Sequence, residues 1–325
     1  MGRLTMRRLR GLGAVLIGHV LAAAGVAVAV ATLAFVAVQM APGDVAFRIA
    51  EARYGERISL QTVDQARAAT GMDQNVMVQY LRWVESSLTG QLGRSMVSGR
   101  PVMPDVWRSF QTTSGVAVTG VGLALFMSLI IGFAVGMQQD RILDRAFLFA
   151  SAILSSVPSF LIGIALITLF AITLRWLPAA GNNRPGYAIL PSCTLALALL
   201  PDLSRVARNA VVRTLQDFYP TYGRIKGQSW PRIVFRHAFR PTLVPIVAYF
   251  GPLVAHTIGG LVVIDVLFNL DGVGTRLIDS VLAADIPMAM GAGLLIGVSV
   301  VAVNGISDIM VQLLDPRLST ARLWP

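Results

Sequence analysis

The 325-residue chain is 55% hydrophobic and only 14% charged, whereas soluble domains have about 25% charged residues. This composition excludes an ordinary soluble globular protein and indicates a polytopic membrane protein. The formal net charge of +10 could suggest nucleic-acid binding, but the arginines lie between long apolar runs, so we expect no nucleic-acid partner.

Six segments without charge meet or approach the roughly 20 residues that a transmembrane helix needs. Within lipid the backbone must satisfy its own polar groups, so we expect six helices and an all-α fold. The fourth segment is the weakest, because it is short and Pro191 interrupts it; we expect it to continue past Asp202 toward Arg205. The segments are 11–43, 109–139, 146–174, 185–201, 241–264 and 286–307.

Arginine placement predicts the orientation of these helices. The apolar run after MGRLTMRRLR continues to Met40, beyond the roughly 7–15 residues of a signal-peptide core, so we expect an uncleaved anchor. The N-terminus carries four arginines, and the densest basic cluster lies between the fourth and fifth segments. The positive-inside rule places both in the cytoplasm, and six spans return the C-terminus to the same side.

These spans divide the chain into four predicted parts. Residues 1–44 form an N-terminal segment with the first transmembrane helix, and residues 45–108 form an extracytoplasmic subdomain. The stretch VQYLRWVESSL in that subdomain is typical of an amphipathic helix. Residues 109–312 form a five-helix core with a loop at 213–240, and residues 313–325 form a cytoplasmic tail.

The loop contains GRIKGQSWPRIVFRHAFRPTLVP at 223–245, which is too basic to lie in hydrocarbon. It could be only a topology anchor. However, its order of a short helical stretch, a glycine, a second helical stretch and a proline near the next span resembles the coupling loop of ABC importer permeases. These are the binding-protein-dependent inner-membrane components, and the resemblance is closest to the dipeptide, oligopeptide and nickel branch. The matching positions in the loop are Tyr219, Arg224, Lys226, Gly227, His237 and Pro245.

Further motifs resemble the same family in the same order along nearly the whole chain. They are MAPGD at 40–44, GQLGRS at 90–95, VPSFLIG at 157–163, RVARN at 205–209, VIDVLFNLDGVG at 263–274, ADIP at 284–287 and DPR at 315–317.

The resemblance implies a permease subunit without catalytic residues or a cofactor of its own, which moves a solute from outside into the cytoplasm. The chain has no Walker A motif, because its only lysine is followed by Gly227. ATP and Mg would therefore be bound by two ABC ATPase subunits or domains. The other implied partners are a second, homologous permease, an extracytoplasmic substrate-binding protein and membrane lipid, with the chain in the cell inner membrane.

The resemblance favours short peptides as the substrate, with nickel or a peptide-like solute such as glutathione as alternatives. A secondary transporter is less favoured, because the chain shows no inverted repeat and no paired charges at midspan. A membrane anchor without a transport path is a third class, and co-purification of an ATPase would distinguish the importer from both.

A coupling loop must dock in a cleft of an ATPase, and the residue types suit this task. Gly227 permits a turn that a Cβ would hinder, and Trp230 can supply apolar contact. Exposed ion pairs contribute only about 0–1 kcal/mol each. The basic residues expected to contact the partner, or to shape the loop, are Arg224, Lys226, Arg232, Arg236 and His237.

Three polar residues of the predicted spans are candidates for either helix packing or the transport pathway. Asn304 and Asp308 are four residues apart and share one helix face, and Ser159 adjoins a proline. An ionisable group within a span is a functional hypothesis by default. The three histidines are scattered without metal-ligand spacing, and the chain has a single cysteine, so we expect no metal site.

Overall fold

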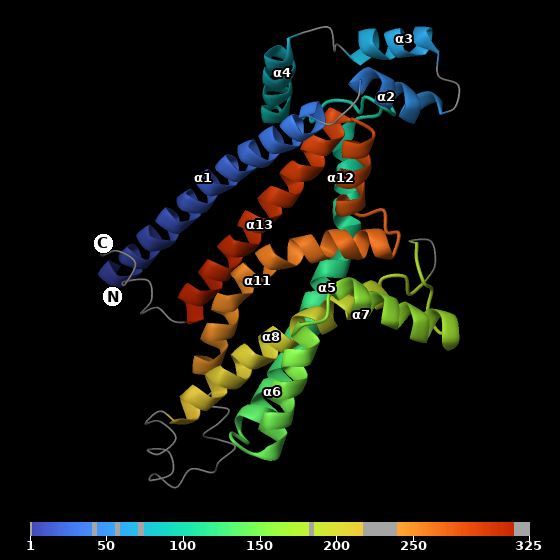
Figure 1. The fold of residues 1–325 in the computed structure, drawn as a ribbon. Coiled ribbons are helices and arrows are strands. Elements are labelled where there is room, and N and C mark those ends of the chain that lie inside the picture. The colour runs from blue at the N-terminus through green and yellow to red at the C-terminus, as the bar shows by residue number, and fades with distance from the viewer. Residues whose placement is uncertain are drawn as a thin grey trace. The chain divides into compact units, whose positions relative to one another are not determined.

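The computed structural model describes residues 2–40, 44–55, 59–70, 75–181, 185–216 and 239–314. These residues form helices joined by short loops, and no strand occurs among them; one isolated β-bridge joins Arg94 and Pro101. The all-α prediction is therefore confirmed. The four long continuous helices in Figure 1 are α1 (Gly2–Met40), α5 (Val102–Gly136), α8 (Ile189–Gln216) and α13 (Ile286–Leu314).

Each of these four helices is long and apolar enough to cross a membrane. Two further spans are bent. The first combines α6 (Ile142–Ser155) with α7 (Ser159–Leu166) and the π-helix η1 (Ile167–Thr173), and it turns by 96°. The second is α11 (Phe239–Leu267), which bends by 61°. The described residues thus hold four candidate spans, or six if each bent pair counts as one.

Prolines explain both bends. Pro158 precedes α7 and disfavours helical geometry at the residue before it. Pro252 lies inside α11 just before the bend, where it removes a backbone hydrogen bond and crowds the preceding turn. Pro191 behaves differently from the prediction. It lies in the first turn of α8, where its missing N–H costs nothing, so the helix continues through it and past Arg205 to Gln216.

The contacts divide the chain into two units. The first contains Met1–His19, Gly115–Phe268 and Ala302–Pro325, and the second contains Val20–Ser114 and Asn269–Val301. Each unit combines segments that are distant in sequence, and the four-part division expected above stays a prediction.

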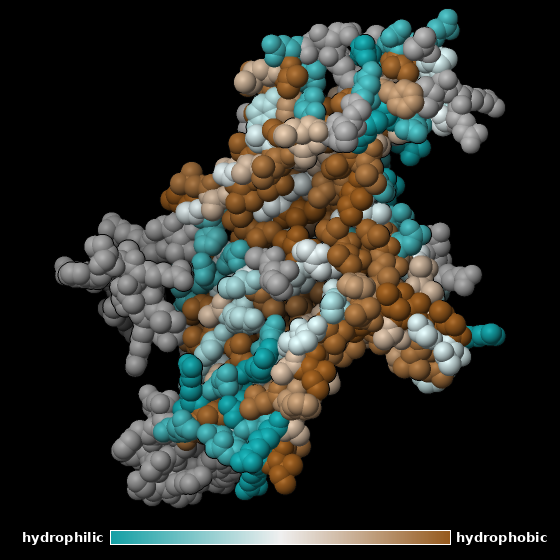
Figure 2. All heavy atoms as spheres, viewed as in Figure 1, coloured by the Kyte–Doolittle hydropathy of each residue, from teal (hydrophilic) through white to brown (hydrophobic). Residues whose placement is uncertain are grey.

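The second unit has one apolar core around three short helices, α2 (Val45–Tyr54), α3 (Leu60–Thr70) and α4 (Val76–Leu88). The helix predicted from VQYLRWVESSL is confirmed as α4, whose Trp83 is buried in this core. In Figure 2, hydrophilic residues gather over α2–α4, whereas hydrophobic residues cover much of the long helices. Buried residues of the core include Phe35, Val38, Ile49, Ala66, Val102, Val106, Met290 and Ala292.

Polar contacts fix the loops of this unit. The buried Asp285 carboxylate accepts hydrogen bonds from the Ser95 hydroxyl and from the Met96 backbone N–H, at 3.0 Å for the latter. The motifs GQLGRS and ADIP therefore meet. The Arg48 guanidinium donates to the Val281 and Leu282 carbonyl oxygens at 2.5 and 2.7 Å, at the end of α12 (Val273–Leu282). An arginine at this position adds a cationic donor to carbonyl groups at the C-terminal end of a helix.

Candidate functional site

Most residues predicted for the coupling loop lie at 217–238, outside the described residues. They are Tyr219, Arg224, Lys226, Gly227, Trp230, Arg232, Arg236 and His237. Among all the residues predicted for the coupling loop, only Pro245 belongs to the described part of the chain. It lies inside α11 and is exposed. The roles of all these residues stay predictions. The two helices that lead into and out of this stretch, α8 and α11, are described and belong to the first unit.

The last turns of α8 are held by a buried ion pair with α6. The Arg208 guanidinium donates from Nε to Asp144 Oδ1 at 2.9 Å and from Nη2 to Asp144 Oδ2 at 2.5 Å. Only 14% of the Arg208 side chain and 2% of the Asp144 side chain are exposed. A bidentate pair of this kind fixes orientation as well as distance. Removing one partner from a buried pair typically costs about 3–5 kcal/mol, because the other charge is left uncompensated.

The same carboxylate also holds the turn between α5 and α6. Asp144 Oδ2 accepts the backbone N–H of Asp140 at 3.0 Å. Asp140 has a φ of 63°, a left-handed conformation that aspartate tolerates better than most residues. Close by, Gln216 Nε2 donates to Gln139 Oε1 at 3.1 Å. The residues just before 217 are thus attached to the α5–α6 turn.

Glycines of α5 allow α8 to approach closely. A Cβ added at Gly132 would lie 2.4 Å from the Ala207 Cβ, and one at Gly136 would lie 2.9 Å from the Val211 Cβ. The two glycines are four residues apart and form a GxxxG pattern, which permits tight helix packing in membranes. The spacing of these glycines can be read from the sequence, but the helix that they contact cannot.

The two candidates on α13 contact different helices. A Cβ added at Gly251 of α11 would lie 2.5 Å from Asn304 Oδ1, so the Asn304 side chain fills the space that this glycine leaves. Asp308 Oδ2 lies 3.4 Å from Nε2 of His19 on α1. Between them, Ser307 Oγ donates to the Val247 carbonyl oxygen at 2.7 Å. These contacts favour helix packing for Asn304 and Asp308 over contact with a substrate.

Ser159 begins α7 directly after the break at Pro158. It is half-buried and lies beside α11, because a Cβ added at Gly260 would be 3.8 Å from Ser159 Oγ. One turn farther on, a Cβ at Gly163 would lie 2.5 Å from Leu267. The structure therefore places Ser159 at a contact between α7 and α11.

Arg205 and Asp202 form an ion pair that was not predicted from the sequence. Arg205 Nη2 donates to Asp202 Oδ1 at 2.5 Å and to Ser155 Oγ at 2.7 Å, which ties α8 to the end of α6. The i,i+3 spacing of the two charged residues on one helix is a signal that could have revealed the pair. No spacing rule would have indicated Ser155, since it belongs to another helix.

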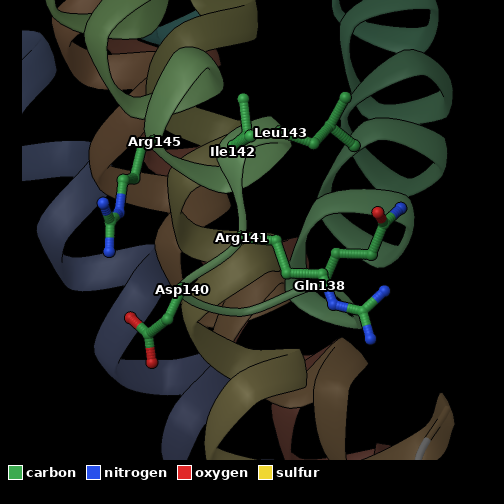
Figure 3. A pocket seen from close by; sticks show the side chains of 6 residues that line it. All are labelled: Gln138, Asp140, Arg141, Ile142, Leu143 and Arg145. Atoms are coloured by element: carbon green, nitrogen blue, oxygen red, sulfur yellow. The ribbon is translucent and has the colours of Figure 1, made fainter.

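An open hollow of about 460 Å³ lies at the α5–α6 turn and is lined by Gln138, Asp140, Arg141, Ile142, Leu143 and Arg145. In Figure 3 the guanidinium groups of Arg141 and Arg145 point to opposite sides of the turn. The hollow therefore does not bring its two cations together on one anion. Among the described residues, no group of three or more His, Cys, Asp or Glu side chains could hold a metal ion.

Comparison with known proteins identifies matches over nearly the whole sequence. Residues 128–320 match the family described as "Binding-protein-dependent transport system inner membrane component". Residues 12–124 match its N-terminal counterpart, "Binding-prot-dependent transport system membrane comp, N-term".

Individual relatives match at similar levels. The "Glutathione transport system permease protein GsiC" of Salmonella paratyphi A is 32% identical over 289 residues, which cover 89% of this chain and 93% of the relative. A protein of Brucella abortus named "Putative peptide transport system permease protein" is 32% identical over 313 residues, which cover 94% of this chain and 98% of the relative.

Proposed function

The chain belongs to the family of binding-protein-dependent transport system inner membrane components, and on that premise we propose that it carries short peptides into the cytoplasm. Members of this family are multi-pass inner membrane proteins without a catalytic role or a cofactor of their own. They function with ATPase and binding-protein partners in ABC importers. The chain is therefore a permease component of such an importer.

The observation that supports a peptide is the match to the Brucella relative, which extends over 94% of this chain. The Salmonella relative is named for glutathione, which is itself built from amino acids through amide bonds. A path for such solutes must tolerate varied side chains. The described spans are rich in small and apolar residues, which is compatible with that requirement.

Deletion of the gene is expected to abolish ATP-dependent uptake of labelled di- to pentapeptides. The measurement compares deletion and wild-type cells, with restoration of the gene as the control. Labelled glutathione and nickel are measured in the same cells. If peptide uptake is unchanged and glutathione or nickel accumulation is lost, the solute that is no longer accumulated is the substrate and the peptide proposal is wrong.

We infer the remaining partners from the same premise. A single chain of up to six spans is small for a peptide path, so a second, homologous permease is proposed beside it, together with two ATPase subunits or domains, an extracytoplasmic binding protein and surrounding lipid. The loop at 213–240 is proposed to dock on an ATPase. A purified, transport-competent assembly with this permease as its sole membrane subunit would indicate a homodimer instead.

The proposed topology has both termini and the loop in the cytoplasm, with residues 45–108 outside. Cysteines are introduced in a Cys193→Ser background at Lys226 and, as the matched outer control, at the exposed Ser98. A membrane-impermeant thiol reagent added to sealed cells is expected to label position 98 and to leave position 226 unlabelled until the cells are opened. Labelling of position 226 from outside would show that the loop faces the outside of the cell. In that orientation the loop could not dock on a cytoplasmic ATPase.

A further inference from the structure

The end of α8 is attached to the α5–α6 turn at two successive levels. Arg208 binds Asp144 through two hydrogen bonds, and the same carboxylate accepts the backbone N–H of Asp140. Two helical turns later, Gln216 binds Gln139. A helix attached to one neighbour at two levels can neither rotate nor slide along it without breaking hydrogen bonds.

This attachment lies next to the segment that is proposed to dock on the ATPase. Gln216 is the last described residue of α8, and most of the segment proposed to dock on the ATPase, residues 213–240, follows it. A movement received at residue 217 would pass along the chain into α8. The ion pair lies about 12 Å back along the helix, at a rise of about 1.5 Å per residue, where α8 meets both α6 and the turn that ends α5.

We propose that Asp144 and Arg208 are positioning residues that make the C-terminal part of α8 and the α5–α6 turn move as one body, so that movement received at the loop reaches α5 and α6 as well as α8. This proposal rests on the proposed function, because it requires the loop to receive movement from an ATPase. The bidentate geometry suits this role, since two parallel hydrogen bonds fix the orientation of the carboxylate as well as its distance. A lysine at 208 would act as a single point charge without that constraint.

A pair that only stabilises the fold would lower the amount of assembled complex without changing how well the assembled complex works. The informative quantity is therefore the number of solute molecules imported per ATP hydrolysed. It is measured in proteoliposomes that contain the purified complete complex and its binding protein, for Asp144→Asn, Arg208→Lys and the exchange Asp144→Arg/Arg208→Asp.

We expect the two single variants to lower this ratio about tenfold, a typical size for a coupling effect of about 1.4 kcal/mol, and the exchange to restore part of it. An unchanged ratio in the assembled single variants would overturn the proposal. An exchange variant that assembles but is no better than the single variants would also overturn it. Failure of wild-type proteoliposomes to import peptides would instead refute the proposed substrate, and the ratio would then be measured with glutathione.

A crosslink tests the same proposal without disturbing the ion pair. Gln139→Cys and Gln216→Cys are combined in a Cys193→Ser background and joined within the complete complex by a short bifunctional thiosulfonate, which forms a disulfide with each thiol and is therefore cleaved by a reductant. If the two segments move as one body, the crosslinked complex is expected to retain the uptake of the uncrosslinked double variant. Loss of uptake on crosslinking, reversed by a reductant, would show that the segments move relative to each other and would overturn the proposal.

Discussion

Gly132→Val is expected to prevent α5 and α8 from packing, whereas Gly122→Val on the same helix is expected to leave the fold intact. A Cβ at 132 would lie 2.4 Å from the Ala207 Cβ and 3.0 Å from the Arg208 backbone nitrogen. Neither atom belongs to a flexible side-chain end, so the helices themselves must separate. We expect the free energy of unfolding to fall by an amount near the upper end of the roughly 1–3 kcal/mol typical of overpacked sites. Solute uptake by this variant is expected to be near background.

The control at Gly122 makes the measurement specific. A Cβ at that position has nothing within 4 Å, and the change in helix propensity is the same at both sites. The thermal stability of the purified, detergent-solubilised subunit is measured, because this readout does not depend on partner chains. Equal stability of the two variants would contradict the packing of Gly132 against Ala207.

Gly227→Asp is expected to abolish transport while leaving membrane insertion normal. Residue 227 lies outside the described residues, so this prediction rests on the resemblance of the loop and on the proposed docking to an ATPase. An aspartate adds a Cβ where a turn is expected and would bury an unpaired carboxylate in the interface, which is costly. Uptake is expected to fall to background, and less ATPase is expected to co-purify.

Gly223→Ala in the same loop is the matched control, because alanine suits a short helical stretch and adds no charge. Both variants are compared at equal membrane expression. Normal uptake by Gly227→Asp under these conditions would contradict the proposed role of Gly227 in docking to the ATPase.

The spans and the amphipathic helix α4 could be predicted from the sequence because they depend on local composition. An apolar run of sufficient length favours a helix in lipid whatever its neighbours are, and most of the described part of each of the six predicted segments lies in a helix or a bent pair of helices. The family could be recognised for a related reason. Its motifs are short and local, and their order along the chain can be read without knowing any contact.

The bends and the extent of α8 were harder to predict. A proline can interrupt a helix or begin one, and its effect depends on which turn it occupies. Pro191 was expected to interrupt the fourth span, but it lies in the first turn of α8. Pro158, within an equally apolar stretch, separates α6 from α7 by 96°. Hydropathy alone does not distinguish these two positions.

The sequence by itself determined that this chain is a helical membrane protein of the importer permease family, since lipid burial and short motifs are properties of contiguous residues. Only the tertiary structure decided which faces meet. Asp144 and Arg208 belong to different helices, as do Gly132 and Ala207. Whether two such residues come into contact depends on the rotation and crossing of their helices, and these are set by the packing of all the side chains between them.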